Sequence, residues 1–153
     1  MGTENYETRF ETRKRYWTYA LVQIQEVHGN HGPFSNVNPS TDNWINGFFG
    51  IGGFNLCCVA NFDSARVEVV FARANKEENK LAFDTLYQHK AEVEAKLGKK
   101  LHWNRGENIK SSKVFIELDG VSIENENDWS QMAKFHAEWT KKFYDVIVPY
   151  IKL

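Results

Sequence analysis

Two strand-like runs lie end to end in the middle of the chain, and they limit the possible folds more than any other feature. The runs at 54–62 and 65–73 are rich in Val, Phe, Cys and Ala, and in the second run apolar residues alternate with polar ones. Only Asp63 and Ser64 separate them, a spacing that predicts a tight β-hairpin. Strands joined by so short a turn pair in the antiparallel sense, so we expect an antiparallel sheet.

The other elements follow from apolar spacing and from turn residues. Three stretches carry apolar residues every three or four positions and are predicted to be helices, at 4–27, 76–97 and 128–148. Two further strand-like runs lie at 101–104 and 113–118. We therefore expect one α+β domain with the order α-β-β-α-β-β-α, in which the helices pack on a four-stranded antiparallel sheet.

Two segments carry more specific expectations. Gly, Asn, Pro and Ser crowd the stretch 29–53, which predicts a long loop. The last predicted helix carries Trp129, Trp139 and Phe143 at helical spacing, and we expect all three to be buried. His136 lies on the same apolar stripe, so a hydrogen-bonded core histidine is favoured over a metal ligand.

Length, charge and cysteine content limit the class of protein. The 153 residues show no linker, which predicts a single domain over 1–153. The net charge of -1 gives no overall field for a polyanion, so nucleic acid would need a local basic patch. Cys57 and Cys58 are adjacent and would point to opposite faces of a strand, which predicts no disulfide between them and a cytoplasmic location. No apolar run approaches 18 residues, so no membrane partner is expected.

Charged residues on two of the predicted strands raise the main functional question. Arg66 and Glu68 are two residues apart, so they share the strand face opposite to the apolar residues. Lys113 and Glu117 alternate with apolar residues in the same way on a later strand. We expect these four side chains to share one surface, which is the candidate recognition surface.

A nuclease site is not expected on this surface. Restriction-like nucleases carry an acid-x-Lys triplet, because carboxylates hold the metal ion while the lysine polarises the attacking water. Val70 stands at the lysine position after Glu68, and Asp119 stands there after Glu117. The triplet is missing, so we expect no catalytic residue, no metal and no cofactor, and ion pairs across a wet sheet face are favoured.

The first predicted helix offers a second candidate surface. Arg13, Lys14 and Arg15 precede two aromatic residues, and basic side chains beside aromatic ones can contact phosphates and stack on bases. These three residues are therefore the candidate nucleic-acid contacts. Three glutamates earlier in the helix offset most of their charge, so a solvated helix face is the favoured alternative.

Several short motifs occur together in a recognisable order. They are Tyr16-Trp17, RVEV at 66–69, KEENK at 76–80 and the L-G-x-x-L-x-W segment at 97–103. With these motifs the chain resembles a bacterial and archaeal family, domain of unknown function 4268. Members of that family occur alone or behind predicted restriction-like nuclease domains, so the resemblance implies an accessory role in nucleic-acid or defence systems. The family usually has Arg at the position of Lys113, and a lysine there would weaken a bidentate contact.

Three functions remain open from the sequence. The favoured one is a non-catalytic recognition module that acts on nucleic acid or on a nuclease-type partner protein. The alternatives are a structural domain that forms a homodimer, and an enzyme whose site combines Arg66, Glu68, Lys113 and Glu117. A basic groove beside exposed aromatics would favour the first, a large exposed apolar patch the second, and a deep pocket with shifted carboxylates the third.

Overall fold

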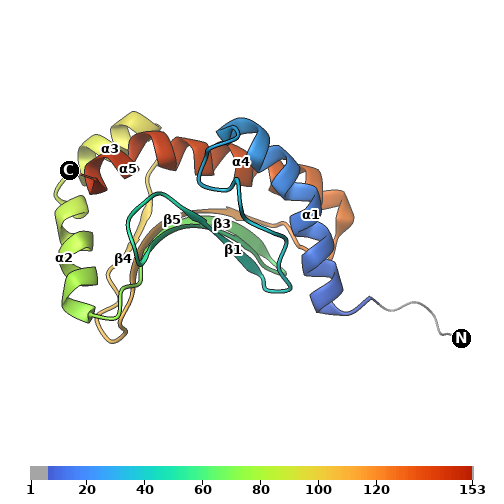
Figure 1. The fold of residues 1–153 in the computed structure, drawn as a ribbon, viewed down its shortest axis with the longest axis horizontal. Helices are drawn as coiled ribbons and strands as arrows, with labels where there is room; N and C mark the ends of the chain where they lie inside the picture. Colours follow the sequence, from blue (N-terminus) through green and yellow to red (C-terminus); the bar gives the residue numbers. More distant parts are fainter. Residues whose placement is uncertain (1–6, 153) are drawn as a thin grey trace, which may run out of the picture.

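The computed structural model describes residues 7–152, which are built around one antiparallel sheet (Figure 1). Its five strands lie in the order β1-β2-β3-β5-β4. The strands are β1 (Trp44–Phe48), β2 (Phe54–Ala60), β3 (Ser64–Phe71), β4 (His102–Asn104) and β5 (Ser112–Asp119). The helices are α1 (Arg9–His28), α2 (Lys76–Tyr87), α3 (Lys90–Leu97), the 3-10 helix η1 (Glu126–Asp128), α4 (Trp129–Val146) and α5 (Val148–Ile151).

The sheet is arched, and its two faces differ in what covers them. Figure 1 shows α1, α3, α4 and α5 above the convex face, while α2 stands beside one end of the sheet. On the concave side, residues 7–152 place no helix. We call this uncovered concave side the open face. None of the helices between residues 7 and 152 is long and apolar enough to cross a membrane.

The α+β class and the antiparallel sheet are confirmed, but the predicted four strands and the predicted order α-β-β-α-β-β-α are wrong. The missed strand is β1, which lies within the stretch predicted to be a loop. Its sequence, WINGF, lacks a clear alternation of apolar and polar residues, because one of its two core-facing positions is Gly47 and not an apolar side chain. A Cβ atom there would lie only 2.7 Å from the ring of Phe34, so the glycine makes room for a buried aromatic from the preceding loop.

The predicted helix 76–97 is two helices, which is a second correction. Helix α2 ends at Tyr87 and α3 begins at Lys90, with His89 in a non-helical conformation between them. The buried residues Leu86 and Val93 lie seven residues, or about two helical turns, apart. The apolar spacing therefore continues across the break and does not reveal it.

Helix α1 begins and ends at clear sequence signals. Thr8 caps its N-terminus in a reciprocal capping box with Glu11, and Gly29, with φ of 81°, follows its last residue. The helix therefore starts later than the predicted 4–27, and positions 4–6 of that prediction lie outside the described residues.

The core lies between the convex face and the helices. Core-facing residues of the central strands are fully or almost fully buried, and they include Leu56, Cys58, Ala65, Val67, Val69, Phe71, Val114 and Ile116. From α4, Trp129 and Phe143 are buried as predicted, whereas Trp139 is only partly buried, so its predicted full burial is wrong. His136 is confirmed as a core histidine, 2.7 Å from the Tyr16 hydroxyl and 2.9 Å from the Val59 carbonyl oxygen.

Candidate functional site

The open face carries the four charged residues that the sequence placed together. Alternation along β3 and β5 turns their core-facing residues toward the helices and the intervening residues toward the open face. In the antiparallel register, Arg66 lies opposite Glu117 and Lys113 lies opposite Val70. The structure thus brings Arg66, Glu68, Lys113 and Glu117 onto one surface.

These side chains form a connected ion-pair network. The Arg66 Nε atom donates to a Glu117 carboxylate oxygen at 2.6 Å, and the Arg66 Nη1 atom lies 3.6 Å from the Glu68 carboxylate. Lys113 donates to the same Glu68 oxygen at 3.4 Å. Glu68 is the most buried of the four, only 5% exposed, and the two cations flank it. The two positive and two negative charges therefore compensate one another, and no net charge remains at the centre.

Phe115 forms the floor of this network. It pairs with Glu68 across the strands, and the Arg66 guanidinium carbon lies 4.4 Å from its ring centroid. His102 of the edge strand β4 stacks on the same ring, with centroids 4.8 Å apart and planes inclined by 18°. Cations over an aromatic face are attracted by the ring quadrupole, so the phenyl ring and the ion pairs hold each other in place.

The other half of the open face has no charged side chain on its strands. Strands β1 and β2 present Trp44, Asn46, Phe48, Asn55, Cys57 and Val59 to this side. Trp44 is 43% exposed and Phe48 is 62% exposed, although both are large and aromatic. The sequence analysis assigned this segment to a loop, so it did not predict that Trp44 and Phe48 share one side of a strand. The available signal was the position of two large aromatics four residues apart, which places them on the same side of a strand.

The pKa shifts of two open-face groups, Glu117 and Cys57, do not suit acid–base or thiol chemistry. The hydrogen bond from Arg66 lowers the pKa of Glu117, which keeps that carboxyl ionised and makes it a poor proton donor. Burial, with a smaller contribution from Glu68 across the strands, raises the pKa of the Cys57 thiol. A thiol held in its protonated form is a weak nucleophile. What the surface can do is present fixed charges of both signs beside exposed aromatic rings.

The residues described, 7–152, contain no group of three or more His, Cys, Asp or Glu side chains arranged to hold a metal ion. Carboxylates of the open face are instead bonded to the basic side chains.

The three basic residues of α1 lie away from the open face and do not form one patch. Successive helical positions are about 100° apart, so three neighbours point in three directions. Arg13 donates to the Thr41 carbonyl at 3.4 Å, whereas Arg15 is held by two carboxylates, from Glu7 at 2.7 Å and from Glu126. Lys14 is exposed between them. Helix α1 packs on the convex side of the sheet (Figure 1), whereas Lys113 turns to the open face.

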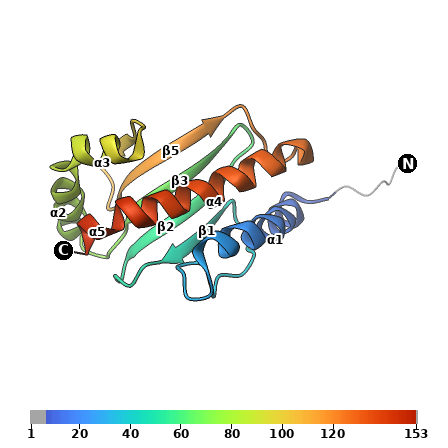
Figure 2. The same cartoon turned by 90° about the horizontal axis from the view of Figure 1, so that it is seen from above.

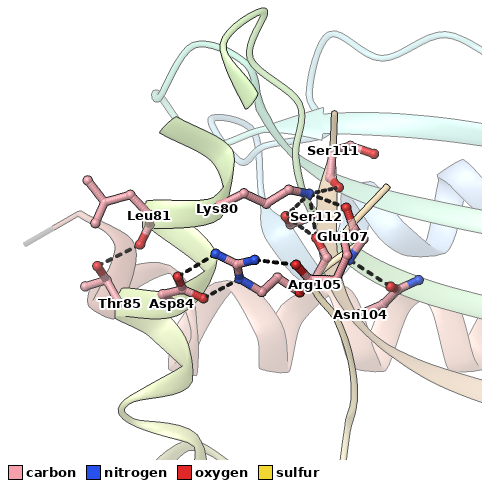
Figure 3. A network of polar contacts seen from close by, with 10 residues as sticks. Lys80, Leu81, Asp84, Thr85, Asn104, Arg105, Glu107, Ser111 and Ser112 are labelled. Atoms are coloured by element: carbon pink, nitrogen blue, oxygen red, sulfur yellow. Dashed lines mark hydrogen bonds and ion pairs between the residues drawn. The ribbon is translucent and has the colours of Figure 1, made fainter. Parts of the chain in front are cut away.

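A second polar network holds the loop before β5, and the sequence analysis did not predict it. The ammonium group of Lys80, on α2, donates to the carbonyl oxygens of Arg105, Gly106 and Ser111 at 2.6–2.7 Å and lies 3.0 Å from the Ser112 hydroxyl (Figure 3). Its side chain is almost fully buried. These acceptors are mostly main-chain oxygens, which any sequence would supply, so no residue pattern predicts them.

Arg105 fastens the same loop from the other side. Its guanidinium makes two hydrogen bonds to the Asp84 carboxylate of α2, at 2.8 and 3.0 Å (Figure 3). Lys76 adds a hydrogen bond of 2.8 Å to the carbonyl oxygen of Glu107. The KEENK motif at the start of α2 thus has a structural role, since its two lysines bind the loop that leads into β5.

Comparison with known proteins identifies a family and no individual relative. The chain matches the family model described as Domain of unknown function (DUF4268) over residues 12–151. Neither the curated proteins nor the solved structures gave a significant match. The matched segment includes both polar networks and every strand of the sheet. This chain therefore belongs to the DUF4268 family of domains of unknown function.

Proposed function

We propose that this domain is a non-catalytic recognition module that binds a protein partner on its open face. The observation that carries the proposal is the composition of that face, where compensated ion pairs lie next to two exposed aromatic side chains and no described helix covers them. The four charged residues would give the face its polar pattern, and Trp44 and Phe48 would supply its apolar contacts.

The distribution of charge favours a protein over a nucleic acid. A phosphate backbone would meet Glu68 and Glu117 as well as the two cations, so little counterion release would be gained. Protein surfaces carry both signs of charge, and complementary charges fix the register of an interface. Trp, Phe and Arg are also enriched where protein interfaces are buried. The open face offers all three residue types.

The family resemblance suggests the class of partner. Members of the family that follow predicted nuclease domains imply a nuclease-type protein, acting in a cytoplasmic nucleic-acid or defence system. Direct contact with nucleic acid through Arg13, Lys14 and Arg15 is the alternative. It is weaker because Arg15 is already held by two carboxylates.

Site-specific photocrosslinking in the native host tests the proposal. A benzophenone amino acid would replace Phe48 on the open face, and a matched control would replace Leu81, which is 68% exposed on α2. We expect a protein adduct from position 48, none from position 81, and loss of the adduct when Trp44→Ala is added. Mass spectrometry of the adduct should identify a nuclease-type protein.

Other outcomes would overturn the proposal in distinct ways. An adduct with a second copy of this chain would favour the homodimer alternative. Fluorescence anisotropy across a salt series tests the nucleic-acid alternative separately, because each phosphate contact steepens the fall of log affinity with log salt by roughly 0.7–0.9. If DNA or RNA binds and a combined Arg13, Lys14 and Arg15 to Ala variant flattens that slope, nucleic acid is the partner.

A further inference from the structure

Strand β5 is paired along its whole length on one side and along less than half of it on the other. All eight residues of β5 face β3, whereas β4 pairs only with Lys113, Val114 and Phe115. Seen from above in Figure 2, β5 borders the sheet and its far end runs on with no described element beside it. The segment 116–119 is therefore an open edge.

The backbone groups that point outward at this edge can be identified. Gly120, just after β5, donates its N–H to the carbonyl oxygen of Asp63 at 3.0 Å, on the β3 side. Because hydrogen bonding alternates along an antiparallel strand, even-numbered residues of β5 face β3 and odd-numbered residues face outward. Among the described residues, β4 covers Lys113 and Phe115, while the N–H and C=O groups of Glu117 and Asp119 have no main-chain partner.

We infer that this edge binds an extended segment of a protein partner, which adds to the sheet in line with β4. Outward main-chain donors and acceptors with strand spacing can be satisfied together by another extended chain. The inference shares Glu117 with the proposed recognition surface but does not need its aromatic half, because Trp44 and Phe48 lie at the opposite border of the sheet.

The side chains of β5 specify the chemistry of that segment. Residues of the incoming strand opposite Glu117 and Asp119 would point to the same side as these two acids, and opposite charges across strands are stabilising. Glu117 already bonds Arg66 at 2.6 Å, so most of the attraction would come from Asp119. The intervening residue would lie over Leu118, which is half-buried on the core side. The edge therefore fits a basic–apolar–basic sequence.

The same acids argue against a second copy of this chain as the occupant. Sheet edges are prone to pair with one another, and charged side chains on an edge prevent this. If two copies paired through 116–119, Glu117 and Asp119 of each copy would crowd the acids of the other. Asp119 is exposed, so its charge faces any chain that approaches.

Titration of the whole chain with a capped hexapeptide of alternating arginine and valine tests the inference. With ¹⁵N-labelled protein, we expect saturable shifts of the Glu117 and Asp119 amides and slower hydrogen exchange at both. A hexapeptide of alternating glutamate and valine should leave these amides unchanged. Asp119→Lys should weaken binding of the arginine peptide about tenfold or more, because it replaces an attraction to arginine by a repulsion.

Methylated peptides make the test independent of protein variants. In the inferred register, the arginine amides donate to β5 and the valine amides point away. N-methylation of the arginine amides should therefore abolish binding, whereas N-methylation of the valine amides should leave it nearly unchanged. Equal effects of the two methylation patterns, amide shifts confined to other strands, or no binding at millimolar peptide would each overturn the inference.

Discussion

The two faces of the sheet are stabilised in different ways. On β3, Val67 and Val69 are fully buried beneath the helices, while Arg66 and Glu68 turn to the open face one residue away. The covered face is stabilised by removal of apolar surface from water. On the open face, a nearly buried carboxylate persists because two cations and an aromatic ring surround it. Buried side chains therefore occur on both faces, but only on the open face does a buried side chain carry a charge that neighbouring cations compensate.

The largest effect should separate a covered aromatic from an uncovered one. Phe143→Ala removes a fully buried ring from α4 and should lower the free energy of unfolding by about 3–5 kcal/mol. Phe48→Ala removes a ring that is mostly in water and should change it by less than about 0.5 kcal/mol. Urea denaturation of both variants measures the contrast. Similar losses would mean that the open face is part of the stabilising core.

A pH titration should separate a covered histidine from an uncovered one. Burial lowers the pKa of His136 from 6.5 to about 4. The unfolded chain therefore binds a proton at this histidine more tightly than the folded chain does. The contribution of neutral His136 to the free energy of unfolding is fully present above pH 6.5 and is lost as the pH falls toward 4. The gap between the two pKa values corresponds to about 3 kcal/mol.

NMR of the histidine ring protons measures this directly. The ring of His136 should remain neutral at pH 5, and His136→Gln should reduce the fall of stability between pH 6.5 and 4. The remaining fall is assigned to His28, whose pKa burial also lowers to about 4. His102→Gln, on the exposed edge strand β4, serves as the matched control for the loss of a histidine side chain. If His136 titrates like an unfolded histidine, the proposed neutral hydrogen bonds to Tyr16 and Val59 are wrong.

The smallest contrast concerns two lysines of the polar networks. Lys80→Met removes a buried ammonium group that donates to three carbonyl oxygens and contacts a hydroxyl, and should cost about 1–3 kcal/mol. Lys113→Met removes one of the two cations beside Glu68, whose contact of 3.4 Å lies at a partly exposed site. Arg66 still compensates Glu68, so the loss should be less than about 1 kcal/mol. Thermal melts of the two variants give the comparison. An equal or larger loss for Lys113 would assign the open-face network a mainly structural role.

Local signals made much of the fold predictable. The short gap between the two strand-like runs identified the central hairpin, although the observed turn is 61–63 and Ser64 already belongs to β3. The predicted helix ends at 27 and 97 agree to within one residue with the ends of α1 and α3. Strand β1 was missed because Gly47 is explained only by Phe34, a residue of the preceding loop whose position the sequence does not reveal. The break at His89 was missed because the apolar spacing continues through it.

The candidate site was predictable to the same extent. Alternation placed Arg66, Glu68, Lys113 and Glu117 on outward positions, but only the β3–β5 register pairs Arg66 with Glu117. The aromatic half required β1, and the main-chain acceptors around Lys80 have no sequence signature. The pairing of distant segments decided each of these features.

The central pairing of β3 with β5 has a consequence for the order of folding. Strands β1, β2 and β3 follow one another with short connections, whereas residues 72–111 intervene before β5. Closing a long loop costs more conformational entropy than closing a short turn, so we expect the β1–β2–β3 meander to form first. Pulse-labelled hydrogen exchange should then protect the amides of β2 before those of β5. The aromatic half of the open face would exist early in folding, and its ion pairs would form only when β5 arrives.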